Sequence, residues 1–556
     1  MTDGRPWAPV PLARGTHGAV VAPHHLATSA GLAILRAGGS AVDAAIATNA
    51  VLGVVMPSGC GIGGDAFWLI WDADEGRQSA LNGSGRAAGA SDPAGLRASG
   101  RMSIPRRGPL SITVPGAVRS WGDAHARFGR LSRAAILAPA IELARGGFPA
   151  SESFIKAVEI ATPWVAETLG PDTGFFSVYR PAGRPWRPGE RIRLPALATT
   201  LSALADDGFD AFYDGPLGER QAQALDAIGS PIAISDFADH RSTWGEPLSM
   251  DYRGVRVTTH PPNSSGIVAL ELLGILAQFE PPAAAAFGLD GMTDASWIHL
   301  GIEAAKLAMA DRDACLTDPA FRDIPTDRLV DPAYLATLAA RIDPRRAAHP
   351  PAATNPSGGG TVYLAIVDGE GNAVSLIESN YLGFGSGVVD PNTGIHYHNR
   401  GSYFSLDPRH PNVLEPGKRT LHTLLPGMLF RDGAAGPWVV AGSMGGDAQP
   451  QIHAQFVSSV VDGGLDVRTA VTAPRWFVEP ADHFAPPLQV RLEPRHVPGI
   501  AETLASFGHP MTPTAPFDDD LGHEHAIELI DGGPASPEGS LAAATDPRSD
   551  GLPAVW

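Results

Sequence analysis

Cysteine and basic residues are both scarce in this sequence. Cys60 and Cys315 are the only cysteines among 556 residues, which excludes a disulfide framework and a cysteine cluster for zinc. Lys and Arg number 41 against 59 Asp and Glu, so the formal net charge is −18. There is no basic block that could displace counterions from nucleic acid or an anionic membrane, and we expect neither as a partner.

Long hydrophobic runs are also absent. The opening residues, MTDGRPWAPVPLARGTHG, contain no apolar core like that of a signal peptide, and no run of about 18 apolar residues occurs anywhere. The longest apolar stretch, around 44–55, is interrupted by Thr48 and Asn49 and is typical of a core helix. These absences predict a cytoplasmic protein.

The composition that remains is that of a folded globular protein, with 44% hydrophobic and 18% charged residues. This length allows three or four domains, although large α/β enzymes often form one unit. Local patterns predict a strand at 19–22 and helices at 25–37 and 41–54, with Ser40 and Asp43 forming a capping box. Apolar periodicity predicts further helices over 131–146, 194–205 and 295–314, and a strand is predicted over 252–260.

A glycine-rich stretch, GCGIGGD at 59–65, has the Gly-x-Gly-x-x-Gly spacing of dinucleotide-binding loops. In those loops the glycines follow a strand and open a helix. Here they follow a predicted helix and precede the apolar run 66–72, so the order is reversed. We interpret the stretch as a tight loop or a place of close backbone packing, and we expect no nucleotide, metal or organic cofactor.

The composition changes at 343–360, where DPRRAAHPPAATNPSGGG has four prolines and three consecutive glycines. This segment predicts a mobile linker. Residues 361–368 and 373–379 then predict two strands of a hairpin joined by the turn GEGN. Their nearly continuous apolar character predicts burial on both faces.

The junction of linker and strand places Gly360 directly before Thr361. A threonine hydroxyl needs an adjacent base to be a good nucleophile. A cut before Thr361 would create an α-amino group with a pKa of about 8 on the same residue. The hydroxyl could make this cut by attacking the carbonyl of Gly360, which has no side chain in the way. Alternatively, Thr361 is an ordinary β-branched residue at the start of a strand.

Two further motifs have competing interpretations. Gly445 and Gly446 follow an apolar strand, and such a turn can direct two backbone N–H groups at one spot, as an oxyanion hole requires; the alternative is a simple tight turn. His523 and His525 flank a glutamate, but two histidines without a third ligand are weak grounds for a metal site. We expect this second motif to lie in a surface loop.

Taken together, the motifs make the chain similar to the γ-glutamyltransferase family of N-terminal-nucleophile hydrolases. The resemblance covers nearly the full length. Blocks that carry it include HGAVVAPHHLATSAGLAILRAGGSAVDAA (17–45), SGCGIGGDAF (58–67), VPGAVRSW (114–121), PPNSSG (261–266), EAAKLAMADRD (303–313), TVYLAIVDGEGNAVS (361–375), PGKR (416–419), GSMGGDAQPQ (442–451) and TDPRSDG (545–551).

The resemblance implies an α+β fold, a four-layer αββα sandwich, with self-cleavage between Gly360 and Thr361. Thr361 would be the nucleophile, Ser379 a second hydroxyl close to it, and Gly445 and Gly446 the oxyanion hole. Cleavage would give a large subunit, 1–360, and a small catalytic subunit, 361–556. These would form one αββα unit as a noncovalent heterodimer, or a heterotetramer of two such pairs.

The sequence departs from the family at the positions that hold a γ-glutamyl group. An Arg-Glu pair of the family is replaced by Ser84-Gly85, with Arg86 displaced along the loop, and the other changed positions are Tyr381, Arg400, Tyr403, His422 and Thr423. Tyr403 replaces the aspartate expected to meet the substrate ammonium, and an unpaired buried ammonium is costly. Arg400 is a new cation suited to a carboxylate. Arg400 as a structural ion-pair partner and His422 as a core histidine remain open alternatives.

This balance predicts a threonine amidohydrolase acting on a small amide that bears a carboxylate and lacks an α-amine. The pocket motifs look closer to the oxamate amidohydrolase branch and to lidless acylase-like relatives, and the segment 406–415 is short where transpeptidases carry a lid loop. One alternative is a true γ-glutamyltransferase or glutathione hydrolase. Another is a binding protein that kept the fold and lost self-cleavage.

Overall fold

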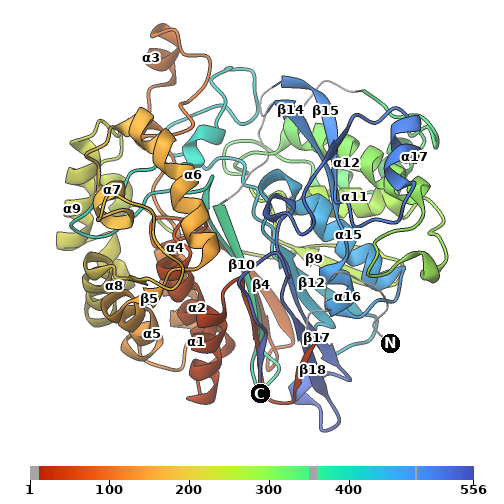
Figure 1. The fold of residues 1–556 in the computed structure, drawn as a ribbon, viewed down its shortest axis with the longest axis horizontal. Helices are drawn as coiled ribbons and strands as arrows, with labels where there is room; N and C mark the ends of the chain where they lie inside the picture. Colours follow the sequence, from red (N-terminus) through yellow and green to blue (C-terminus); the bar gives the residue numbers. More distant parts are fainter. Residues whose placement is uncertain (1–11, 350–359, 483–484) are drawn as a thin grey trace.

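Two β-sheets packed face to face, each covered outside by helices, make up the molecule (Figure 1). The structure, a computed structural model, describes residues 12–349, 360–482 and 485–556. In Figure 1 the red-to-yellow helices cover one sheet on the left, and the green-to-blue helices cover the other on the right. The predicted four-layer αββα fold is confirmed.

The two sheets have seven antiparallel strands each. The β10 sheet has the order β19 (Ala554–Val555), β2 (Ala19–Val21), β10 (Gly360–Val367), β11 (Ala373–Tyr381), β3 (Asp65–Asp72), β4 (Arg77–Gly83) and β7 (Thr243–Gly245). The β13 sheet has the order β1 (Ala13–Gly15), β18 (Ser540–Ala544), β17 (Glu524–Ile530), β13 (Val439–Ser443), β12 (Gly427–Arg431), β9 (Val255–Thr259) and β8 (Leu248–Tyr252). Both sheets mix strands from the two sides of the Gly360–Thr361 bond.

Helices on the side of the β10 sheet all precede residue 240. They are α1 (His25–Arg36), α2 (Ala41–Val55), α3 (Pro93–Ala98), α4 (Ala117–Phe128), α5 (Arg133–Gly146), α6 (Glu152–Leu169), α7 (Gly174–Tyr179), α8 (Pro195–Asp207), α9 (Gly215–Asp226) and α10 (Ile234–Ala238). The helix α2 packs directly on β10 and β11. Two short strands, β5 (Phe148–Pro149) and β6 (Arg191–Ile192), pair beside them.

Helices on the side of the β13 sheet come from the later part of the chain. They are α11 (Gly266–Leu276), α12 (Ala295–Cys315), α13 (Thr326–Leu329), α14 (Pro332–Ala339), α15 (Gln449–Val461), α16 (Val467–Thr472) and α17 (Ile500–Ser506). A small sheet of β14 (Trp476–Asp482), β15 (Ala485–Leu492) and β16 (Met511–Pro513) adjoins them. None of the helices among the described residues is long and apolar enough to cross a membrane.

Three large apolar clusters fill the spaces between the four layers. Strand β10 shows how one strand serves two of them, because its side chains alternate between faces. Val362 and Leu364 pack toward the helices, whereas Tyr363 and Ala365 pack between the sheets. Every residue of β10 is buried, as its nearly continuous apolar sequence predicted.

Most predicted elements are present with small shifts at their ends. The capping box of α2 is formed by Ser40 and Asp43 as predicted, and β10 and β11 form the predicted hairpin. The strand predicted over 252–260 is present as β9, but it begins later than expected. Tyr252 is the end of β8, because Arg253 and Gly254 have φ of 54° and 80° and form a turn between the two strands.

The predicted linker 343–360 is described only in part. Residues 350–359 lie outside the described residues. Those before them make specific contacts: Ala347 N donates to Phe507 O at 2.8 Å, and Lys306 Nζ donates to Ala348 O at 2.8 Å. The start of this segment is therefore held against the protein.

Candidate active site

Three polar side chains form a row across the end of the β10 sheet. Thr361 on β10 lies opposite Ser379 on β11, which lies opposite Asp65 on β3. Paired residues point to the same face of a sheet, and here that face is the one toward the β13 sheet, which Tyr363 and Ile377 also share. All three side chains of the row are at most 2% exposed.

The Ser379 hydroxyl is the centre of this row. Its Oγ lies 3.0 Å from Thr361 Oγ1 and donates to Gly360 O at 2.7 Å. It also accepts hydrogen bonds from Tyr381 N at 2.7 Å and from Arg400 Nη2 at 3.2 Å. One hydroxyl therefore contacts both the Thr361 hydroxyl and the carbonyl of the preceding residue.

The backbone is irregular at this point. The pairing register shifts between Gly360 and Thr361, so β10 and β11 form a bulge there. Tyr381, opposite Gly360, has a φ of 74°, which is unusual for a residue with a bulky side chain. A Cβ at Gly360 would lie 2.3 Å from Ser58 O, so only glycine fits. Bulges of this kind often re-aim side chains next to active sites.

Gly445 and Gly446 connect β13 to α15. Their φ values are 145° and 57°, and the second is a left-handed conformation that favours glycine. Among the described residues neither N–H has a hydrogen-bond acceptor. Gly445 lines the same cleft as Thr361. Unsatisfied N–H groups ahead of a helix are suited to a developing oxyanion.

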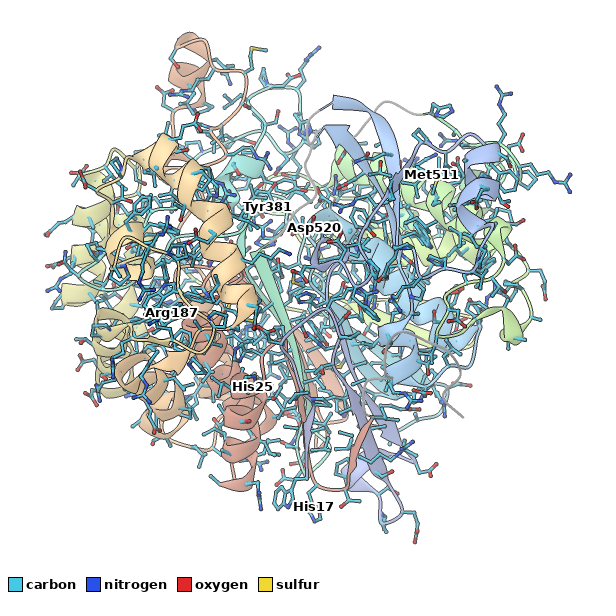
Figure 2. All side chains as sticks on the ribbon, viewed as in Figure 1. His17, His25, Arg187, Tyr381, Met511 and Asp520 are labelled. Atoms are coloured by element: carbon cyan, nitrogen blue, oxygen red, sulfur yellow. The ribbon has the colours of Figure 1, made fainter. Side chains whose placement is uncertain are left out.

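The cleft beside Thr361 has a volume of about 460 Å³. One wall comes from α6 with Lys156, Ile160 and Trp164, and the opposite wall from Phe477 and residues 519–523 and 548–550. Figure 2 shows Tyr381 and Asp520 close to the upper end of β10, where the cleft lies. The segment 406–415 does not contribute to the lining, in keeping with the expected absence of a covering lid.

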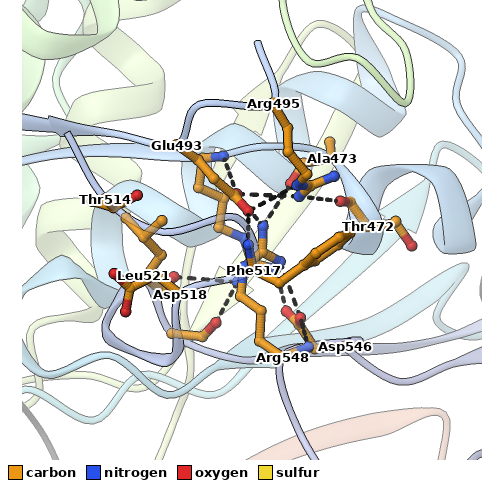
Figure 3. A network of polar contacts seen from close by, with 12 residues as sticks. Thr472, Ala473, Glu493, Arg495, Thr514, Phe517, Asp518, Leu521, Asp546 and Arg548 are labelled. Atoms are coloured by element: carbon orange, nitrogen blue, oxygen red, sulfur yellow. Dashed lines mark hydrogen bonds and ion pairs between the residues drawn. The ribbon is translucent and has the colours of Figure 1, made fainter. Parts of the chain in front are cut away.

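A buried ionic network fixes the wall at 548–550 (Figure 3). Arg548 contacts Glu493 and bonds Asp546 Oδ1 at 3.0 Å, and Arg495 bonds Glu493 Oε1 at 2.8 Å. Burial alone would raise the pKa of Asp546, but Arg475 and Arg548 outweigh it and lower that pKa. Breaking such a network would leave uncompensated buried charge, so the wall is held firmly.

Arg400 is buried beside the row and has no carboxylate within ion-pair distance among the described residues. Its Nη2 contacts Ser379, its Nη1 donates to Thr423 Oγ1 at 3.3 Å, and its Nε has no partner in the part of the chain that the structure describes. The guanidinium lies 4.4 Å from the centre of the Tyr381 ring. Burial lowers the pKa of Arg400, and the spare N–H groups are suited to a bound anion.

Tyr403 contacts a carboxylate that sequence reasoning did not identify. Its hydroxyl donates to Asp447, and Arg312 Nη1 bonds the same Asp447 oxygen at 2.6 Å. Burial raises the pKa of Asp447 even though Arg312 is adjacent. Asp447 is therefore already paired with a cation. Its place directly after Gly446 in GSMGGDAQPQ was the signal that could have drawn attention to it.

Asp65 joins His422 to the row. His422 Nε2 lies 3.3 Å and His398 Nδ1 3.6 Å from Asp65 Oδ2. Burial alone would raise the pKa of Asp65, but His398, His422 and Arg400 outweigh it and lower that pKa to about 2. Burial and Arg400 lower the pKa of His422 to about 3, so the imidazole is neutral at pH 7. Sequence reasoning missed Asp65, which ends the GCGIGGD stretch.

Comparison with known proteins places this chain in a family. The family model described as Gamma-glutamyltranspeptidase matches residues 27–556. The chain belongs to this family.

Relatives within the γ-glutamyltranspeptidase family cover nearly the whole chain. The glutathione hydrolase-like YwrD proenzyme of Bacillus subtilis is 39% identical over 538 residues, covering 97% of this chain and 98% of the relative. The oxamate amidohydrolase proenzyme of Klebsiella pneumoniae is 40% identical over 560 residues, covering 97% of this chain and 99% of the relative. The crystal structure of a cephalosporin acylase from Bacillus halodurans has a TM-score of 0.89 and 38% identity, covering 100% of this chain and 99% of that one.

Two sequence expectations fail in this family member. Arg86 is not part of the cluster around Thr361, because its Nη1 lies 3.3 Å from Asp318 Oδ2 and donates to Gly417 O at 3.1 Å. His523 and His525 do not lie in a surface loop: both are buried, and His525 is within β17, paired with Gly442. The structure places the other predicted residues in successive contacts leading away from Thr361. Ser379 contacts Thr361, and Tyr381 and Arg400 contact Ser379. Thr423 and Tyr403 lie beside Arg400, and His422 is linked through Asp65.

Proposed function

We propose that this γ-glutamyltranspeptidase-family protein cuts its own chain between Gly360 and Thr361 and then hydrolyses small carboxylate-bearing amides with Thr361 as nucleophile. The observation that carries the proposal is the contact of Ser379 Oγ with both Thr361 Oγ1, at 3.0 Å, and Gly360 O, at 2.7 Å. A nucleophile and a polarised carbonyl thus belong to one peptide unit.

In the self-cleavage step, Thr361 Oγ1 attacks the carbonyl carbon of Gly360 and its proton passes to the amide nitrogen. The Ser379 hydroxyl stabilises the charge that develops on the Gly360 oxygen. The C–N bond breaks to leave an ester, which water hydrolyses to a Gly360 carboxylate and a free Thr361. The new subunits, 1–360 and 361–556, stay together because each sheet contains strands of both; two such heterodimers pairing into a heterotetramer would be a further level of assembly.

In turnover, the free α-amine of Thr361 is the base for its own hydroxyl. The hydroxyl attacks the substrate amide, the N–H groups of Gly445 and Gly446 stabilise the oxyanion, and the leaving amine takes up the proton. Water then hydrolyses the acyl-enzyme ester. No step uses a metal or an organic cofactor.

The substrate class follows from the charges around Arg400. Its guanidinium has no carboxylate partner among the described residues, whereas Asp447 is paired with Arg312 and Tyr403. A substrate carboxylate would complete the first group. A substrate ammonium would meet an Asp447 carboxylate whose charge Arg312 already balances, and would bring a second buried cation beside it. Oxamate and short acyl amides with a terminal carboxylate fit this balance, and Tyr381, Thr423 and, through Asp65, His422 would shape the pocket.

A gel and N-terminal sequencing test the self-cleavage. Two fragments are expected, the smaller beginning Thr-Val-Tyr, and Thr361→Ala should remain a single chain whereas Thr361→Ser should still be cut. An intact but active chain, or another start, would refute the assignment, and an intact inactive chain would support the binding-protein alternative.

Substrate comparison separates the remaining candidates. Oxamate, a glutaryl amide and a γ-glutamyl anilide are assayed side by side with the cut protein. A preference for the γ-glutamyl anilide over every simple acyl amide would favour a glutathione hydrolase, as the name of the Bacillus subtilis relative suggests.

A further inference from the structure

The segment before the proposed cleavage site is held by a cluster of side chains that the mechanism does not use. His299 Nε2 bonds Asp343 O at 2.8 Å, and His299 Nδ1 bonds His509 Nε2 at 2.8 Å. Ala348 is bound at both ends of its backbone: its N–H donates to Glu303 Oε2 at 3.1 Å, and its carbonyl accepts from Lys306 Nζ at 2.8 Å. We call His299, Glu303, Lys306 and His509 the anchor.

The anchor contains a buried ion pair. Lys306 Nζ lies 2.6 Å from Glu303 Oε1, and the two residues are 7% and 3% exposed. Burial lowers the pKa of Lys306 although Glu303 is adjacent. Two buried charges are costly unless their remaining hydrogen-bonding groups are satisfied, and here the backbone of Ala348 satisfies one group of each. The Lys306–Glu303 ion pair therefore depends on the backbone of Ala348 to satisfy its hydrogen-bonding groups.

The anchor also connects the two prospective subunits. His299, Glu303 and Lys306 lie on α12, and His509 follows α17 in the later part of the chain. Phe507, also after α17, accepts the N–H of Ala347 at 2.8 Å. Eleven residues, 349–359, separate the anchored Ala348 from Gly360. The segment is thus fixed at Ala348 and again at Gly360, where β10 begins.

We propose that the anchor is a positioning device for self-cleavage: it holds residues 343–348 so that the Gly360 carbonyl is presented to Thr361 and Ser379. This proposal rests on the proposed function. Losing the anchor would remove a fixed point of the backbone at Ala348, 12 residues before Gly360. Misplacing a reacting group even slightly slows its reaction by about twofold or more.

A divalent cation is the competing interpretation of this cluster. Three possible metal-ligand atoms lie within 4.8 Å of one another, one each from His299, Glu303 and His509. The anchor is favoured because the two imidazoles are already at hydrogen-bond distance and the Lys306 ammonium contacts the same carboxylate. A cation there would meet that positive charge directly.

The test uses the full chain, pulse-labelled during cell-free synthesis and chased to follow the loss of the uncut band. Lys306→Met and Glu303→Gln are compared with wild type, with Lys306→Arg as the conservative variant. Glu190→Gln, at the exposed pair with Arg184, is the matched control. We expect Lys306→Met and Glu303→Gln to slow self-cleavage at least about twofold, with partial recovery in Lys306→Arg and no change in Glu190→Gln.

The cut protein supplies the second readout. Once cleavage is complete, kcat/KM should equal that of wild type, because no anchor residue lines the cleft. Unchanged cleavage rates, or kcat/KM falling in parallel with them, would overturn the proposal. If EDTA slowed wild-type cleavage and Zn²⁺ restored it, the cluster would be a metal site instead. A wild-type chain that never cuts would refute the proposed function itself, and the anchor with it.

Discussion

At the scale of single residues, Ser379 has the most specific role. Its hydroxyl donates to the Gly360 carbonyl, so Ser379→Ala should slow self-cleavage by about 10²-fold, the usual effect of removing one oxyanion donor. The measurement is the half-time of the uncut band. Ser375→Ala is the control, because Ser375 lies on the same face of β11 and bonds Tyr363 instead. Equal rates in the two variants would mean that Ser379 only fills space.

Arg400 is expected to determine specificity. Arg400→Gln should lower kcat/KM for an anionic amide by roughly 10²-fold relative to its neutral isostere, the cost of truncating a buried charge-assisted hydrogen bond. Self-cleavage should persist, somewhat slower because Nη2 contacts Ser379. Arg86→Gln serves as the control, since Arg86 is bound to Asp318. If Arg400→Gln lowered kcat/KM equally for the anionic amide and its neutral isostere, the role of Arg400 would be structural.

The oxyanion assignment depends on Gly446. Gly446→Val places a β-branched side chain at a φ of 57° and should turn the N–H away, lowering kcat of correctly cut protein by about 10²–10³-fold. Gly464→Val is the control. It imposes similar backbone strain, at a φ of 63°, in an exposed position where an added Cβ has no neighbour within 4 Å. Near-normal turnover in cut Gly446→Val protein would exclude the role.

At the scale of elements, β11 has different chemistry on its two faces. Ser379 faces the other sheet, and the adjacent Glu378 faces the helices, where its Oε1 accepts from Gly61 N at 2.9 Å. Burial raises the pKa of Glu378 to about 8. The carboxyl is therefore neutral in the folded protein at pH 7 and ionised in the unfolded chain.

This raised pKa predicts a pH dependence of stability. Below about pH 4.5 both states are protonated, and between about 4.5 and 8 only the unfolded chain releases its proton, so folding loses stability as the pH rises. The total is on the order of a few kcal/mol. Glu378→Gln in the uncut Thr361→Ala chain should remove this loss, and its Tm advantage over the parent should grow from pH 5 to pH 8. Exposed Glu502→Gln should show no such trend; a constant difference would contradict the pKa.

The elements that sequence predicted well are those with strong local signals. Ser40 and Asp43 define a helix start by themselves, and the apolar character of 361–368 and 373–379 defines the hairpin. The turn at Arg253–Gly254 was missed because the apolar pattern continues through it on both sides. His523 and His525 were misplaced because their burial comes from pairing with β13, a contact far away in sequence.

The candidate site shows the same division. Thr361, Ser379 and the two glycines could be selected from motifs. Asp447 stands in one of those motifs, but nothing in the motif reveals its partners. Asp65 and Arg312 could not be selected, because their importance comes from a register across three strands and from a contact between α12 and the turn after β13. Arg86 was misassigned because displacement along a loop does not say which way a side chain turns.

At the scale of the whole molecule, the order of strands has a consequence for the cut protein. Strands β10 and β11 are inserted between β2 and β3, and in the other sheet β18 pairs with β1 while β12 pairs with β9. A nick before Thr361 would therefore leave two chains that each contribute strands to both sheets. Separating them would require rupture of five β-ladders, with β19 on β2 as the fifth, and exposure of all three apolar clusters, which is equivalent to unfolding.

The two subunits of the cut protein should therefore not exchange between molecules. Two cut populations, one isotopically heavy and one light, should remain purely heavy or purely light by native mass spectrometry after days of mixing under native conditions, and hybrids should form only after denaturation. Hybrids without denaturation would contradict this strand order. Each small subunit would then stay with the large subunit it was synthesised with. A damaged subunit could not be replaced by one from another molecule.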